Sequence, residues 1–183
     1  MIARLAGMVA LGVLFAAGAA HASTMVAMSV EELAQRSDRV VTGRVVALEP
    51  RASEDGKRIS TVVTLQVEEV WKGAPAQEVR ILALGGTLEG ISQVVTGAAS
   101  FREGEEVVVF LRRLRSAEPL SEVVGMAQGK LSVERDDEGN LVAVPSLKGL
   151  DLVDRGTMVP GPAPLGGPIP VAALQEKVQA ATR

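Results

Sequence analysis

The chain has 183 residues, enough for one domain together with targeting and tail segments. Hydrophobic residues make up 47% of it but aromatic residues only 2%, so its core must consist of Val, Leu, Ile and Ala. The formal net charge is −3 and there is no cysteine, which excludes disulfides, a lipid-anchored cysteine and the basic surface typical of nucleic-acid-binding proteins.

Residues 1–22 have the layout of a secretory signal peptide. Arg4 provides a positive start, the stretch from Leu5 to Ala20 carries no charge, and Ala20-His21-Ala22 is an A-x-A cleavage pattern. The apolar stretch is shorter than the roughly 20 residues of a membrane-spanning helix. We therefore predict cleavage after Ala22 and a protein that is secreted or periplasmic, with no stable membrane insertion after cleavage. The mature chain would contain no His, Cys or Tyr.

A short helix and a strand are predicted next. Ser29 and Glu32 form a capping-box pattern, which predicts a helix that ends near residue 37. The Val-rich segment 40–48 predicts a strand. Gly43 in the middle of this strand indicates a bend or a close approach of another backbone.

The longest predicted strand runs from Ile59 to Trp71. The polar segment 49–57 before it, which ends in Asp55-Gly56, predicts a hairpin loop. The alternation of apolar and polar residues is lost at Glu68-Glu69-Val70, which indicates a β-bulge. A long, bent strand of this kind can serve both sides of a small barrel.

Shorter strands and turns follow. We predict strands at 79–83, 107–111, 123–133 and 141–144, and a less distinct one at 91–96. Gly85-Gly86 is predicted to stop the strand 79–83, and turns are predicted at Glu103-Gly104 and Asp136–Asn140. The apolar run 107–111 indicates a strand covered on both faces. Three aromatic residues are expected in the core: Trp71, Phe101 and Phe110.

The C-terminal region changes in composition. Residues 156–170 contain five of the nine prolines and predict an irregular linker or strap. Val171, Leu174 and Val178 then mark a final short helix with Pro170 near its first turn. Five to seven strands, one of them long and bent, predict a mainly β fold: a small OB-like barrel over residues 23–155 with short N- and C-terminal helices, the second within 156–183.

Catalytic and cofactor chemistry is not indicated. Without His or Cys the mature chain lacks the usual zinc ligands and the usual base for a serine nucleophile, so we predict no metal, no cofactor and no enzyme. No phosphate-binding glycine motif is present. The carboxylate pairs Glu68-Glu69 and Glu105-Glu106 are interpreted as solvated edges, because neighbours on a strand point to opposite faces. The basic cluster Arg112, Arg113 and Arg115 is interpreted as a solvated strand end.

Three segments carry a resemblance to a known family. They are Val40-Val41-Thr42-Gly43-Arg44-Val45, Val67-Glu68-Glu69-Val70-Trp71-Lys72-Gly73 and Gly104-Glu105-Glu106-Val107-Val108-Val109-Phe110-Leu111. Between Ser37 and Val133 the chain resembles bacterial secreted proteins of uncharacterised function, which are similar in turn to the netrin-like and tissue-inhibitor-of-metalloproteinase (TIMP-like) OB domains.

This resemblance implies an OB-like barrel that binds a protein. In the metalloproteinase inhibitors the free N-terminal amine and first carbonyl chelate the zinc of the protease. The corresponding segment here is the predicted mature start, so Ser23, Thr24 and Met25 are the candidate partner contacts. Both cysteines that lock this segment to the barrel in the family are missing, so a disulfide does not preorganise it.

Three functional hypotheses follow; two exclude catalysis, and the third is an enzyme, which would need a mechanism that uses carboxylates alone. The first is an exported domain that binds a secreted or envelope protein, for example as a protease-inhibitor-like module. The alternative is an envelope structural or small-ligand-binding barrel with no protein partner, in which the loop from Gly85 to Ser100 would form the mouth of the site. Binding of nucleic acid is not expected, because the chain is acidic and has few aromatic residues to stack on bases.

Overall fold

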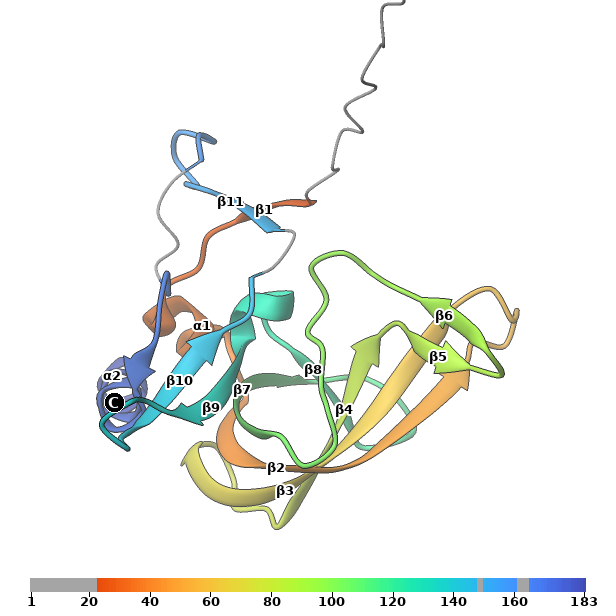
Figure 1. Cartoon of the computed structure of the whole chain (residues 1–183), viewed down its shortest axis with the longest axis horizontal. Coiled ribbons are helices and arrows are strands. Elements are labelled where there is room, and N and C mark those ends of the chain that lie inside the picture. The colour runs from red at the N-terminus through yellow and green to blue at the C-terminus, as the bar shows by residue number, and fades with distance from the viewer. Residues whose placement is uncertain (1–22, 148–149, 161–164) are drawn as a thin grey trace, which may run out of the picture.

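The fold is mainly β, with one short helix near each end, as the sequence predicts (Figure 1). The computed structural model describes residues 23–147, 150–160 and 165–183. The predicted signal peptide, residues 1–22, lies outside the described residues. None of the helices in the described ranges is long and apolar enough to cross a lipid bilayer.

The described residues form twelve strands rather than the five to seven expected. The elements are β1 (Ser23–Val26), α1 (Val30–Arg36), β2 (Arg39–Ala52), β3 (Ile59–Lys72), β4 (Glu78–Leu84), β5 (Gly86–Leu88), β6 (Ile91–Gln93), β7 (Glu106–Arg113), β8 (Leu120–Val123), the 3-10 helix η1 (Met126–Gly129), β9 (Lys130–Arg135), β10 (Leu141–Pro145), β11 (Leu150–Val153), β12 (Ile169–Pro170) and α2 (Val171–Ala181). The additional strands have two to four residues, too few for alternation of apolar and polar side chains to show.

The large sheet closes partly on itself. Its order is β12-β10-β9-β7-β2-β3-β4-β8, and β8 also pairs with β7, so β7, β2, β3, β4 and β8 form a five-stranded ring. The seam between β4 and β8 is parallel and has only two residue pairs, Arg80 with Leu120 and Ile81 with Ser121. Two small sheets lie outside this ring: the hairpin β5–β6 and the parallel pair β1–β11 (Figure 1).

The hairpin β2–β3 confirms the predicted bulge and the role of Gly43. Thr42 pairs with Glu69 and Gly43 with Val67, which leaves Glu68 as the extra residue of a bulge. A Cβ on Gly43 would lie 2.1 Å from the carbonyl oxygen of Gln66. The predicted loop 49–57 is wrong at its start, because β2 continues to Ala52. The strand tolerates Pro50, which has no backbone N–H to donate, because β7 pairs with β2 only as far as Arg44. Beyond Arg44 this edge of β2 has no partner in β7.

The predicted strand 123–133 is wrong, because a turn interrupts it. Gly125 has a φ of +69°, which reverses the chain into η1 before β9 begins. Gly129 is required for a different reason: a Cβ there would lie 2.0 Å from the carbonyl oxygen of Val124. Apolar residues on both sides of these glycines hide the break from a reading of hydrophobicity alone.

Two apolar clusters fill the molecule, one on each face of β7. Val107, Val109 and Leu111 lie in the cluster inside the ring, whereas Val108 and Phe110 lie in the cluster that packs against the two helices. This confirms that β7 is covered on both faces. Of the predicted core aromatics, Trp71 and Phe110 are buried, but Phe101 is only partly buried, at the open end of the ring.

Both helices begin where the sequence predicts. The capping box of Ser29 and Glu32 is present, and α1 is closed at its other end by the ammonium of Lys72, which donates to the carbonyls of Ala34 and Ser37 at 2.7 Å each. Pro170 is the N-cap of α2. The predicted irregular stretch 156–170, of which 161–164 lie outside the described residues, is wrong at its end. Ile169–Pro170 forms the edge strand β12, which pairs with β10, and an edge strand tolerates the missing N–H of a proline.

Candidate functional site

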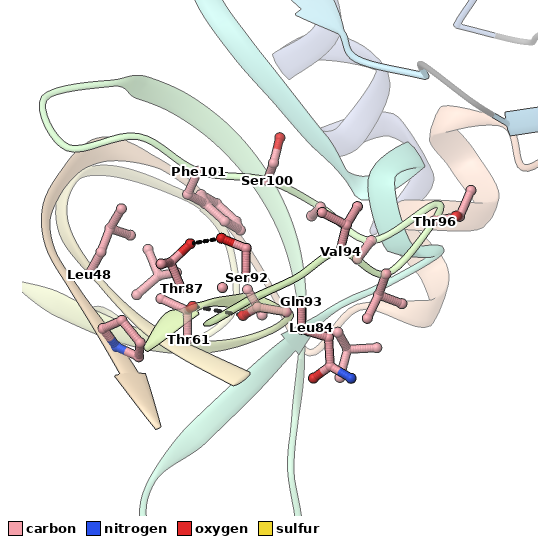
Figure 2. A pocket seen from close by; sticks show the side chains of 18 of the residues that line it. Leu48, Thr61, Leu84, Thr87, Ser92, Gln93, Val94, Thr96, Ser100 and Phe101 are labelled. Carbon is pink, nitrogen blue, oxygen red and sulfur yellow. Dashed lines mark hydrogen bonds between the residues drawn. The ribbon is translucent and has the colours of Figure 1, made fainter. Parts of the chain in front are cut away.

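A cleft lies at the mouth of the five-stranded ring. It has a volume of about 640 Å³ and lies between β2, β3, β4 and the segment 84–101, which crosses the open end (Figure 2). Leu48, Val63, Ala83 and Phe101 provide an apolar wall continuous with the core inside the ring. None of the residues that line the cleft is charged. The structure thus places a cleft where the sequence suggested the mouth of a site, at residues 85–100.

Two glycines turn the chain from β4 over the mouth. Gly85 and Gly86 have φ values of +88° and +141°, which other residues adopt only with strain. A Cβ on Gly86 would lie 2.3 Å from Oγ1 of Thr61, so this position also requires the absence of a side chain. The prediction that Gly85-Gly86 stops a strand is confirmed for β4, but Gly86 also begins β5.

The polar side chains of the cleft are mostly bonded to the protein itself. The Thr61 hydroxyl donates to the carbonyl of Gly85 at 2.8 Å, and the hydroxyls of Thr87 and Ser92 lie 2.7 Å apart (Figure 2). The side-chain oxygen of Gln93 accepts the backbone N–H of Ile59. These bonds hold the hairpin β5–β6 against β3, so they shape the cleft.

Exposed apolar side chains gather at the rim. Leu84, Ile91 and Val94 are 51%, 67% and 88% exposed. All three belong to the segment 84–101, and Leu84 and Val94 line the cleft. Apolar residues grouped beside an open cleft are typical of binding surfaces.

The candidate contacts Ser23, Thr24 and Met25 lie in β1. They pair in parallel register with Leu150, Asp151 and Leu152 of β11. The buried amide of Gln128 holds the chain just after them: its oxygen accepts the N–H of Met28 at 2.9 Å. Its nitrogen donates to the carbonyl of Val26 at 3.1 Å. Tertiary hydrogen bonds therefore order this segment without a disulfide.

The same strand borders the segment that covers the cleft. A Cβ on Gly97 would lie 2.7 Å from the side chain of Leu150 and 3.5 Å from the sulfur of Met25. The carbonyl of Gly97 accepts the N–H of Ala127 at 2.9 Å. The structure thus brings Met25, a candidate contact from the sequence, next to the segment 84–101, whereas Thr24 does not line the cleft.

One interpretation of the acidic residues is wrong. Glu105 is not solvated: its carboxylate forms an ion pair with Lys130, and the side chains are 15% and 5% exposed. Ser132 donates to the same carboxylate at 2.7 Å, and Lys130 donates to Ser132 at 3.0 Å. Burial alone would raise the pKa of Glu105, but the hydrogen bonds from Lys130 and Ser132 and the charge of Lys130 lower it below its usual value.

This buried group adjoins the cleft. The ammonium of Lys130 lies 5.7 Å from the centre of the Phe101 ring, which is part of the cleft wall. This ammonium is paired with Glu105, which also accepts a hydrogen bond from the Ser132 hydroxyl. The sequence did not indicate this group, because residues 105 and 130 meet only in the folded sheet.

The remaining polar clusters make internal bonds. Glu69 accepts from the Trp71 ring nitrogen at 2.9 Å, and Arg112 forms an exposed ion pair with Glu122. Asp136 accepts the backbone N–H of Asn140 at 2.8 Å, which closes the predicted turn at 136–140 on itself. Across the described ranges, no three His, Cys, Asp or Glu side chains lie close enough to hold a metal ion.

Comparison with known proteins does not assign the chain to a family. No protein-family model matches the chain, and no curated protein matches it. The resemblance to netrin-like and TIMP-like domains therefore stays a prediction from the sequence.

Proposed function

We propose that the protein is an exported, non-enzymatic binding domain whose site is the cleft at the mouth of the ring. The observation that carries this proposal is the cleft's entirely uncharged lining, beside an exposed apolar rim. Its volume of about 640 Å³ falls within the range of small-molecule sites, and barrel mouths are a frequent place for them. Export rests on the signal-peptide pattern of residues 1–22.

We also propose an OB-like architecture for the barrel. An OB fold is a five-stranded, partly open barrel. The ring of β7, β2, β3, β4 and β8 supports this proposal, as does its short seam of two residue pairs. The long, bulged strands β2 and β3 add further support, because both extend beyond the ring to the wall of the cleft.

Titration of the purified protein with a neutral, polarity-sensitive fluorescent dye tests the binding site. We expect one saturable site with a blue-shifted emission. Val94→Asp should weaken binding at least about tenfold, since it places a charge at the rim of an uncharged cleft. Val46→Asp is the matched control, because Val46 is also exposed but does not line the cleft. Absence of saturable binding, or equal weakening by both variants, would overturn the proposal.

A second candidate function is binding of a secreted protease or another envelope protein by β1. The observation that favours it is the ordering of β1 by β11 and Gln128, which supplies the preorganisation that the missing disulfide cannot. Inhibition assays with a panel of purified secreted proteases test it. We expect inhibition to be lost in Thr24→Arg and kept in Thr157→Arg, since both threonines are exposed but only Thr24 lies in β1. No inhibition of any protease by the unmodified protein would count against this function.

A further inference from the structure

The lining of the mouth cleft also indicates the chemical class of its ligand. We infer that the cleft holds the aliphatic chain of an uncharged amphiphile, such as a lipid or a glycolipid-like surfactant, with the polar head at the rim. This inference rests on the proposed function, because it concerns the same site. It is carried by the charge, the hydrogen bonding and the shape of the lining.

Charge excludes an ionic group from the depth of the cleft. No Asp, Glu, Lys or Arg lines it, so a buried carboxylate, phosphate or ammonium on the ligand would have no partner. The nearest buried charges, Glu105 and Lys130, are already paired with each other behind Phe101. The ligand segment that enters the cleft is therefore neutral.

Hydrogen bonding favours a chain without polar atoms. Thr61 is bonded to the Gly85 carbonyl, Thr87 and Ser92 are bonded to each other, and the oxygen of Gln93 is taken by Ile59. A peptide that entered the depth would bury N–H and C=O groups against side chains that are already satisfied, at a cost for each unpaired group. A hydrocarbon chain has no hydrogen bonds to lose there, and removal of its apolar surface from water lowers the free energy of binding.

Shape favours a slender aliphatic chain over a ring. Small residues line much of the cleft: Ala83, Gly85, Gly86, Gly97, Ala98 and Ala99. Phe101 is its only aromatic residue, and the Lys130 ammonium already lies over that ring. A sugar or an aromatic ligand would therefore find at most one face of a single ring to stack on.

The rim fits an uncharged polar head. The exposed residues Thr96 and Ser100, both part of the lining, add hydroxyl groups. Leu84 and Val94, which also line the cleft, add exposed apolar surface. Hydroxyl groups beside apolar side chains can contact both the head and the first methylenes of an amphiphile.

A chain-length series tests the inference. Alkyl glycosides of increasing chain length, each below its micelle concentration, compete with the neutral dye for the full-length protein. Burial of each methylene should tighten binding about fourfold until the cleft is full, after which affinity should level off. Fatty-acid carboxylates of equal length and short apolar peptides form the comparison arms, and both should bind more weakly than the matching glycoside.

Variants of the cleft wall localise the effect. Ala83→Val should shorten the chain at which affinity levels off, because Ala83 lies on the wall of the cleft. Ala47→Val is the matched control on strand β2 of the same sheet, since Ala47 does not line the cleft. Ala99→Val serves as a second wall variant if Ala83→Val does not fold, as judged from thermal unfolding.

The outcomes separate this inference from the proposed function. If the dye binds but affinity does not rise with chain length, or if peptides or carboxylates bind more tightly than glycosides, the aliphatic assignment is wrong and the site remains. If levelling off occurs at the same chain length in every wall variant that folds, the chain does not lie in this cleft. If neither the dye nor any amphiphile binds, the proposed function itself fails.

Discussion

The carboxylate of Glu105 and the ammonium of Lys130 form a nearly buried ion pair that joins the turn before β7 to the start of β9. Ser132 completes the group by bonding to both side chains, and the backbone N–H of Arg102 donates to the second carboxylate oxygen of Glu105 at 3.1 Å. Since Phe101 lies directly before Arg102 and packs under the Lys130 ammonium, the ion pair positions one wall of the mouth cleft.

Removal of the charge of Glu105 should destabilise the protein strongly. Glu105→Gln leaves the Lys130 ammonium buried without a counter-charge, and loss of one partner of a buried pair typically costs about 3 kcal/mol or more in free energy of unfolding. Urea denaturation of the purified variant measures this loss.

A matched surface pair provides the control for this variant. Arg112 and Glu122 form an ion pair with side chains 60% and 36% exposed, so Glu122→Gln should change the free energy of unfolding by less than about 1 kcal/mol. The double variant Glu105→Gln with Lys130→Met should recover much of the loss, because no charge is then buried alone. Equal effects of Glu105→Gln and Glu122→Gln would show that the buried pair has no special role.

The same pair should make stability depend on acidic pH. The pKa of Glu105 is lower in the folded protein than its ordinary value of 4.5, so protonation favours the unfolded state. Its contribution is therefore fully present above about pH 5 and is lost as the pH falls through the folded-state pKa. Free energies of unfolding from about pH 7 to about pH 3 should converge for the protein and Glu105→Gln. Parallel curves for the two proteins would contradict this assignment.

Gln128 should control the order of the N-terminal strand. Gln128→Ala removes both bonds to the backbone around β1 and leaves the buried N–H of Met28 without its acceptor, a cost of about 1–3 kcal/mol. We expect faster hydrogen exchange in residues 24–28 than in the unmodified protein. Gln175→Ala is the matched control, since Gln175 is only partly buried and donates an exposed hydrogen bond of 3.2 Å to Glu69. Unchanged exchange in Gln128→Ala would show that β11 alone holds β1 in place.

Local patterns in the sequence were sufficient to predict the elements that depend on interactions between residues close together in the chain. The capping box of Ser29 and Glu32 lies within one helical turn, and the break in alternation at residues 68–70 corresponds to an actual bulge. The run 107–111 indicated burial on both faces because it contains no polar residue.

Contacts between distant segments were beyond such patterns. β1 and β11 are four residues each and are far apart in the chain, and the amide of Gln128 reaches Met28 across 100 positions. The cleft likewise has one part that local sequence patterns predicted and one part that depends on distant contacts. Gly85 and Gly86 marked its mouth in the sequence, but the wall formed by Leu48, Val63 and Phe101 exists only after the ring has closed. Glu105 looked solvated because its partner Lys130 lies on another strand.

Gly43 should be among the positions least tolerant of a side chain. It lies in β2 where β3 bulges, and an added Cβ would lie 2.1 Å from the carbonyl oxygen of Gln66 and 3.1 Å from Cα of Val67. Both neighbours are backbone atoms, so relief requires movement of β3 itself. Gly43→Ala should therefore lower the free energy of unfolding by about 3 kcal/mol, at the upper end of the usual cost of overpacking.

The control for this substitution is Gly167→Ala. No atom lies within 4 Å of a Cβ at Gly167, and its φ is not in the left-handed region, so its replacement should be neutral or slightly stabilising. Thermal unfolding of the two variants side by side makes the comparison. If Gly43→Ala unfolds at the same temperature as Gly167→Ala, β2 and β3 are not in the tight contact described here. Because these strands carry the wall of the cleft, a loss of dye binding in Gly43→Ala at temperatures where it is still folded would link the bulge to the shape of the site.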